Sequence, residues 1–354
     1  MQELDNKLEE NNFNFQWHIN ERCNLRCTHC YQEDYDSFDE MSFDELRLTA
    51  DNLIRALKKW NKKGKIAITG GEPFLKKELF PLLEYLSGQE QIINLYILTN
   101  GTLVTDDICS KIVSLPKVSR VQISLDGASP TTHDGIRGKG SFQKALNGID
   151  SLSRHGIKVN LMYTVQKANK EDIPALFDLA LEKQINSLLI ERFVPCGSGK
   201  QIKDQMLSTA ELKEVFTYIS KRADAEYDRG NSLMVVKQRP LWILVDPEKA
   251  RSNPTYPIQK QIGGICSIGL DNLTILHDGT VLPCRRLNIP IGNLKEDSLF
   301  KIWYGSEVLW GIRDKRNLKG KCKSCEYLAL CSGCRAVAYA CSTDYLEEDP
   351  QCWK

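Results

Sequence analysis

The hydrophobic positions of the chain follow two alternating patterns between Phe13 and about Asp228. Short runs rich in β-branched and aromatic residues, such as FNFQWHI at 13–19, are typical of buried strands. The longer segments between them repeat apolar residues every three to four positions, as amphipathic helices do. This alternation recurs six times, and it predicts six βα units whose parallel strands are joined by right-handed crossovers.

The predicted elements can be placed along the sequence. Strands are expected at 13–19, 65–69, 92–101, 118–127, 157–165 and 185–194. Helices are expected at 41–60, 78–87, from Thr105, at about 141–154 and 171–183, and from Ser208. Two of these helices begin with a capping box, formed by Ser42 with Glu45 and by Ser208 with Glu211. A parallel barrel and an open parallel sheet both satisfy this pattern.

The character of the sequence changes after about residue 230. Helical periodicity fades, and proline, glycine and cysteine become more frequent. The segment HDGTVLPC has the form of a hairpin with Asp278 and Gly279 at its turn. We therefore divide the chain into an N-terminal tail (1–12), a βα region (13–232) and a cysteine-rich region (233–354).

Composition and charge narrow the class of protein. The formal net charge is only +1, with 47 basic against 46 acidic residues, so no surface for nucleic acid or an anionic membrane is predicted. The N-terminal segment is polar and acid-rich, unlike a signal peptide, and no uninterrupted apolar run of about 18 residues exists. We expect a cytoplasmic protein that binds neither nucleic acid nor membrane.

The cysteines are numerous and unevenly distributed. Of the 13, three fall within 23–30 and eight within 266–352. Because disulfides are rare in a reducing compartment, clustered cysteines there indicate metal binding or thiol chemistry. Of the two that stand apart, Cys109 is expected in the core of a helix, and Cys196 follows the sixth strand, as a loop residue or a catalytic thiol at the barrel mouth. The CGSGK segment beginning at Cys196 lacks the spacing of a phosphate-binding loop.

Polar motifs follow four successive predicted strands. They are the loop ERCNLRCTHCYQ, then GGE, TNG and SLDG. Because the carboxyl ends of parallel strands share one face, we expect these motifs to form one site. The first holds Cys23, Cys27 and Cys30, which suit three irons of a four-iron cluster and leave the fourth iron open. A zinc site that borrows His29 or His18 is the alternative.

The sequence CNLRCTHCY, with its CxxxCxxC spacing, resembles the signature of the radical S-adenosylmethionine (SAM) superfamily over about 13–230. The resemblance implies a partial (β/α)6 barrel of the TIM type. It also implies that SAM binds the open iron and is cleaved to a 5′-deoxyadenosyl radical that abstracts hydrogen from the substrate. A flavodoxin- or ferredoxin-type electron donor is the expected partner.

The same resemblance assigns SAM contacts to the other loops. Gly70 and Gly71 allow close backbone approach, and Glu72 can accept a hydrogen bond from the SAM ammonium. The remaining contacts implied by motif position are Asn100, Ser124, Asp126, Arg137 and Tyr31. An ordinary strand-to-helix turn at GGE, turn chemistry at Asn100, a surface cation at Arg137 and a core role for Tyr31 are the alternatives.

The C-terminal cysteines resemble those of the SPASM extension, which carries two auxiliary [4Fe–4S] clusters. The resemblance assigns Cys322, Cys325, Cys331 and Cys352 to one cluster and Cys266, Cys284 and Cys334 to the other. Cys341 is an extra thiol. Either it is the fourth ligand of the three-cysteine set, or the cluster held by that set keeps an open iron. Three clusters in total are therefore expected, with a pair of zinc ribbons as the alternative.

The reaction is less well defined by the sequence. Sulfatase maturases carry an acidic residue after the GxxxxC cysteine, whereas this chain has Arg285 and Arg286, which suit a peptide carboxylate or a porphyrin propionate. A solvated basic turn is the alternative. We predict maturation of a ribosomally made peptide or protein first, such as thioether or carbon–carbon crosslinking. Tetrapyrrole side-chain chemistry comes second, and a non-enzymatic iron–sulfur or zinc protein is the alternative of another class.

Overall fold

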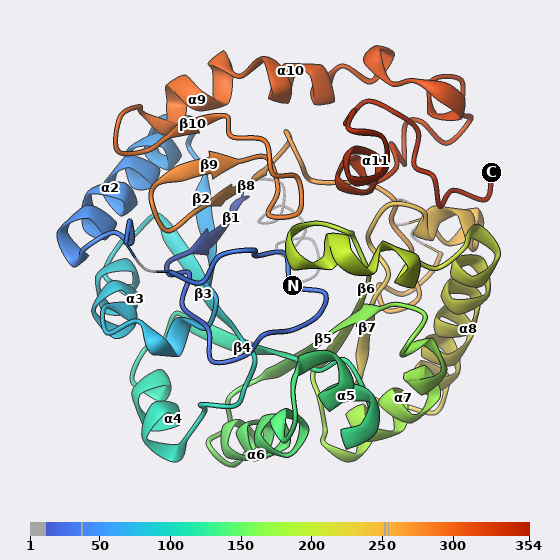
Figure 1. Ribbon diagram of the computed structural model, residues 1–354, viewed down its shortest axis with the longest axis horizontal. Coiled ribbons are helices and arrows are strands. Elements are labelled where there is room, and N and C mark those ends of the chain that lie inside the picture. Colours follow the sequence, from blue (N-terminus) through green and yellow to red (C-terminus); the bar gives the residue numbers. More distant parts are fainter. Residues whose placement is uncertain (1–11, 37, 251–252, 254) are drawn as a thin grey trace.

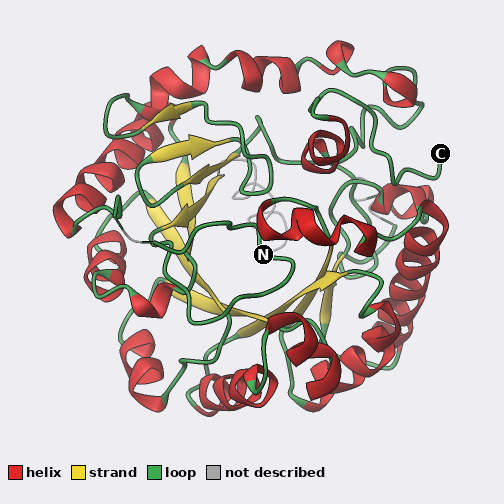
Figure 2. Cartoon of the chain, viewed as in Figure 1, coloured by secondary structure: helices red, strands yellow, loops and turns green. Residues whose placement is uncertain are grey.

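The computed structural model describes residues 12–36, 38–250, 253 and 255–354 (Figure 1). Helices surround the strands on the outside, and long loops gather at the mouth of the barrel (Figure 2). In the described part of the chain, no helix is both long and apolar enough to cross a membrane.

One twisted sheet of ten strands forms the centre of the described residues, in the order β10-β9-β8-β1-β2-β3-β4-β5-β6-β7. Its strands are β1 (Asn12–His18), β2 (Lys63–Thr69), β3 (Ile92–Thr99), β4 (Val118–Ser124), β5 (Val159–Val165), β6 (Ser187–Arg192), β7 (Met234–Val236), β8 (Asn272–Ile275), β9 (Thr280–Leu282) and β10 (Gly292–Asn293). Strands β1 to β7 pair in parallel with their neighbours, which is the predicted partial barrel.

Most of the helices lie outside these strands (Figure 1). The helices are α2 (Phe43–Trp60), α3 (Leu79–Ser87), α4 (Asp106–Val113), α5 (Pro130–Arg137), α6 (Ser141–Arg154), α7 (Ile173–Glu182), α8 (Thr209–Asp228), α9 (Leu299–Gly305), α10 (Glu307–Arg313) and α11 (Arg335–Ser342). Of these, α11 lies inward of α10 (Figure 1). Both predicted capping boxes are present, at Ser42 before α2 and at Ser208 before α8. The six predicted βα units are thus confirmed, and Cys109 lies buried on α4 as expected.

The sheet extends past the sequence boundary drawn at 232/233. Strand β7 adds to β6, and β8 pairs in parallel with β1, so the C-terminal region contributes strands at both ends of the barrel sheet. The predicted hairpin is present, because β8 and β9 pair antiparallel around Asp278 and Gly279. The cysteine-rich region is therefore built onto the barrel edges, and the predicted tail lies outside the described residues except for Asn12.

A buried ion pair fixes the C-terminal segment to the barrel. Arg192, at the end of β6, donates two hydrogen bonds to Asp349, with Nη1–Oδ1 3.1 Å and Nη2–Oδ2 2.8 Å. Asp349 also accepts from the backbone N–H of Cys334 and of Gln351. Burial of Asp349 would raise its pKa, but Arg192 lowers that pKa overall, so the pair is ionised at neutral pH.

Replacing Arg192 by methionine should leave Asp349 buried without its cation. Breaking one partner of a buried pair costs about 3–5 kcal/mol, so the urea midpoint of the anaerobic protein should fall clearly. Arg154→Met breaks an exposed pair with Asp106 and should leave that midpoint unchanged. Equal midpoints for the two variants would show that Arg192 and Asp349 do not hold the C-terminal segment in place.

Candidate active site

A cavity of about 330 Å³ occupies the mouth of the barrel, and the three-cysteine loop forms part of its wall. Cys23, Cys27 and Cys30 all line it, together with Gly70 and Gly71 from the loop after β2. Burial raises the pKa of Cys27 to about 12, and the neighbouring thiols of Cys30 and Cys23 add to this shift. The predicted meeting of the cysteine and glycine loops is therefore present in the structure.

Close backbone contact locks these two loops together. The N–H of Gly71 donates to the carbonyl of Asn20 and that of Glu72 to the carbonyl of Arg22, each at 2.8 Å. A Cβ atom on Gly71 would overlap the backbone of Arg22 and Glu21. Position 71 therefore requires glycine because the cysteine loop passes directly against it.

Asp126 ties the cysteine loop to the far side of the barrel. Its Oδ2 lies 3.1 Å from His29 Nε2 and 2.5 Å from Arg137 Nε, while its Oδ1 accepts from the backbone N–H of Thr164 at 2.7 Å. Burial would raise the pKa of Asp126, but Arg137 and His29 lower it overall. Arg137 in turn lies 3.7 Å from the sulfur of Cys27. The carboxylate is therefore ionised and organises the loop.

Glu72 plays a similar part between β2 and β3. Its carboxylate accepts from the hydroxyl of Thr99 at 2.7 Å and from the backbone N–H of Asn100 at 2.9 Å. Burial raises the pKa of Glu72 to about 7, although these hydrogen bonds act to lower that pKa. In this structure the side chain holds the loop that carries Asn100, and its direct contact with SAM stays a prediction.

The other residues predicted to contact SAM divide into two groups. Asn100, Ser124, Arg137 and Tyr31 line the cavity beside the three cysteines, as do both glycines. Asp126 and Glu72 are fully buried behind the cavity wall. The structure thus brings the predicted residues together. The two carboxylates hold the surrounding loops in place, and the other residues line the cavity.

The donor set fits the cofactor that the sequence implies. In the described residues, no group of three or more His, Cys, Asp or Glu side chains is spaced to share one metal ion. A four-iron cluster takes each thiolate at a different iron, and three thiols that line one cavity suit it. His29 and His18, the alternative fourth ligands, contact Asp126 and Glu21 instead.

The C-terminal cysteines form two neighbourhoods. Burial raises the pKa of Cys266 to about 12, and the nearby thiols of Cys334 and Cys284 contribute. Burial also raises the pKa of Cys331 and that of Cys352, where the thiols of Cys322 and Cys331, respectively, add to the effect. The assignment of these cysteines to two cluster ligand sets stays a prediction.

The two remaining C-terminal cysteines are Cys341 and Cys325, and each has its own surroundings. Cys341 lies on α11 with its sulfur 3.9 Å from Met206 Sδ, and Lys203, Asp349 and Arg192 are the charged groups that influence its pKa after burial. Cys325 is bonded through its backbone N–H to the carbonyl of Cys322, which keeps it beside that set. A ligand role for Cys341 stays a prediction.

A second cavity, of about 670 Å³, lies between the cysteine loop and the C-terminal region. It shares Tyr31, Gln32, Cys196, Arg285 and Arg286 with the smaller cavity, so the two adjoin along these side chains. Cys196 therefore faces the barrel mouth. Burial raises the pKa of its thiol to about 11, which keeps it protonated at neutral pH, and a catalytic role for it stays a prediction.

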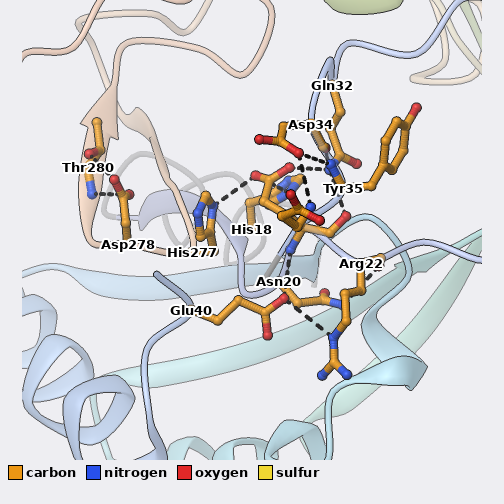
Figure 3. Close-up of polar contacts among 12 residues, drawn as sticks. His18, Asn20, Arg22, Gln32, Asp34, Tyr35, Glu40, His277, Asp278 and Thr280 are labelled. Carbon is orange, nitrogen blue, oxygen red and sulfur yellow. Dashed lines mark hydrogen bonds and ion pairs between the residues drawn. The ribbon is translucent and has the colours of Figure 1, made fainter. Parts of the chain in front are cut away.

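Two histidines and a glutamate form a buried network beside the larger cavity. His18 Nε2 lies 3.1 Å and His277 Nδ1 lies 2.8 Å from Glu21 Oε1, and the Gln32 amide contacts the other carboxylate oxygen. His18, Gln32 and His277 converge in Figure 3, although they come from β1, the cysteine loop and the turn after β8. Sequence reasoning missed this network; the one available signal was a histidine at the end of a predicted strand.

A second charged cluster lies across the cavities and was also missed. Glu191 Oε1 lies 2.8 Å from Arg239 Nε, and its Oε2 lies 3.4 Å from Arg286 Nη2. Burial would raise the pKa of Glu191, but the two arginines lower it overall. A charged residue near the end of the apolar run SLLIER was the only sequence signal for it.

Comparison with known families agrees with this geometry. Residues 17–180 match the model of the radical SAM superfamily, and residues 266–326 match an iron–sulfur cluster-binding domain, SPASM. The chain is 31% identical to the AdoMet-dependent heme synthase of Methanosarcina barkeri, over 95% of each chain. It is 29% identical to the Fe-coproporphyrin III synthase of the same organism, over 95% of this chain and 86% of that one.

A more distant relative and two solved structures are also similar. The mycofactocin maturase MftC of Mycolicibacterium smegmatis is 25% identical over 95% of this chain and 81% of its own. Streptococcus suis SuiB bound to the precursor peptide SuiA has a TM-score of 0.75 at 20% identity, covering 99% of this chain and 78% of that one. The enzyme anSMEcpe with bound AdoMet has a TM-score of 0.74 at 19% identity, covering 96% and 90%. These two structures share the fold.

The His18 network predicts a pH dependence of stability. Burial, with help from Arg285, lowers the pKa of His18 to about 4, whereas an unfolded histidine titrates near 6.5. Between these values the unfolded chain binds more protons, so stability falls as the pH falls. From pH 7 to pH 5.5 the native protein should lose about 1 kcal/mol more than a His18→Gln variant, as measured by anaerobic urea unfolding. Equal losses would refute the buried neutral histidine.

Proposed function

Because this chain belongs to the radical SAM superfamily and carries a SPASM iron–sulfur domain, we propose that it is a tetrapyrrole-modifying enzyme that abstracts hydrogen from a carboxylate-bearing side chain. Radical SAM enzyme chemistry follows from the family, and the tetrapyrrole substrate is the new element. The observation that carries it is the larger cavity, whose inner end adjoins the cysteine loop and holds Arg285 and Arg286.

The chain's own residues would hold the cofactors as follows. Cys23, Cys27 and Cys30 would bind one cluster, and the SAM would lie along Gly70 and Gly71. When bound, the cluster and SAM supply an electron and the 5′-deoxyadenosyl radical that takes the substrate hydrogen. The buried Asp126 and Glu72 keep the surrounding loops in place, and the barrel excludes water from the reacting atoms.

Two observations favour a tetrapyrrole over other substrates. Relatives at 31% and 29% identity over 95% of the chain are named for heme and Fe-coproporphyrin III synthesis. The cavity of about 670 Å³ lies within the size range of small-molecule sites and carries arginines that suit propionate groups. This substrate replaces peptide maturation as the first choice.

Peptide maturation remains the second candidate on a specific observation. Acidic side chains gather at the rim of the larger cavity, among them Glu33, Asp34, Asp36 and Asp39. Such a rim suits a cationic peptide segment better than a polyanionic macrocycle. The maturase relative at 25% identity agrees with this choice.

The cluster assignment predicts a specific loss of iron. Replacing Cys23, Cys27 and Cys30 together by alanine should lower iron from about twelve to about eight atoms per chain, since one of three four-iron clusters is removed. Release of 5′-deoxyadenosine from SAM and dithionite should disappear. Replacing Cys322 should spare that release in the absence of substrate. Cleavage that survives the triple replacement would refute the assignment.

The substrate assignment is tested by turnover. The anaerobic enzyme with SAM and dithionite should release 5′-deoxyadenosine faster when iron coproporphyrin III is added, and the porphyrin should lose carbon dioxide and hydrogen in the mass spectrum. A flavodoxin or ferredoxin should replace dithionite. If no porphyrin accelerates the release and a lysine-rich peptide does, the peptide proposal takes its place.

A further inference from the structure

Arg285 and Arg286 both line the larger cavity, but they differ in whether a carboxylate of the protein pairs with them. Arg286 has a carboxylate partner, because its guanidinium contacts Glu191 at 3.4 Å, and it also donates to the carbonyl of Arg192. Glu191 is shared with Arg239, and both arginines lie against the smaller cavity. Arg286 is therefore already paired with a carboxylate of the protein.

Arg285 has no such partner. In the part of the chain that the structure describes, no carboxylate lies within ion-pair distance of it, although only 8% of the residue is exposed. Its Nε donates to His18 Nδ1 at 3.4 Å, and its guanidinium carbon lies 4.2 Å from the ring centroid of Tyr31. These contacts fix the plane of the guanidinium and leave both terminal nitrogens without a hydrogen-bond acceptor among the described residues.

The carboxylate of Glu21 shares His18 with Arg285 and already has other partners. Glu21 contacts His18, His277 and Gln32, and His18 contacts both Glu21 and Arg285. Burial keeps His18 neutral, so it accepts from Arg285 on one nitrogen and faces Glu21 with the other. The network thus orients Arg285 while its charge stays uncompensated.

We infer that Arg285 is the anchor for one carboxylate of the substrate and selects free acids over esters. The inference rests on the proposed tetrapyrrole function and adds the residue that recognises the side chain. A planar guanidinium with two free nitrogens matches a carboxylate in the bidentate mode. Because Arg285 lines both cavities, an acid bound there would place its neighbouring carbons toward the three-cysteine loop.

A binding cycle on the anaerobic holoenzyme tests this role. The probes are iron-free coproporphyrin III and its tetramethyl ester, and the readout is quenching of tryptophan fluorescence. Arg285→Gln should weaken binding of the free acid about ten- to a hundredfold, as expected for hydrogen bonds between charged groups. Binding of the ester should be the same in both proteins, and Arg285→Lys should recover part of the affinity for the acid.

The control variant is Lys200→Gln, which removes an exposed cation of the same cavity that already pairs with Glu33 at 2.7 Å. It should change neither affinity by more than about twofold. SAM cleavage without substrate should also be unchanged in Lys200→Gln, so a change in porphyrin binding by Arg285→Gln is read against a variant with intact cofactor chemistry.

Two results would overturn the inference. They are equal acid binding by the native and Arg285→Gln proteins, and a parallel loss of ester binding in the variant. The second would show a structural role for Arg285. If the native protein binds neither porphyrin, the proposed function itself fails.

Discussion

The ionised carboxylate of Asp126 is the interaction on which the active site depends. It is fully buried, and such a charge persists only where cations and N–H groups surround it. Asp126 therefore draws in His29 from the cysteine loop, Arg137 from α5 and the backbone of Thr164 on β5. A loop without regular structure is fixed in this way across the mouth of the barrel, with its three thiols facing one cavity.

A buried ion pair also connects the barrel to the C-terminal region. The bidentate contact of Arg192 with Asp349 ties the end of β6 to the backbone of Cys334, so this cysteine is placed relative to the barrel mouth. Strand β8 completes this joint beside β1 and carries the turn with His277. The larger cavity is thus enclosed by groups from both regions whose positions are set by buried charge pairs.

The repeating βα pattern was predictable because each unit is encoded locally, by apolar periodicity and by caps such as Ser42 with Glu45. The meeting of the four strand-end motifs was predictable because parallel strands end on one face. The pairing of His18 with Glu21 and His277 was not, because these residues join only when β8 adds to β1. Likewise, motif position suggested that Asp126 contacts SAM, whereas its burial behind the wall depends on packing.

An unpaired buried arginine is a cost to the folded protein, since a desolvated cation is favourable only beside an anion or a comparable acceptor. The Tyr31 ring and a neutral His18 offset part of that cost, whereas the adjacent Arg286 has a carboxylate partner in Glu191, which it shares with Arg239. The carboxylate of Glu21, which contacts the same His18, is engaged by two histidines and Gln32. Among the residues that the structure describes, Arg285 is thus a buried cation of this wall without a carboxylate partner. Stability given up at one point of a cavity is typical of a binding site.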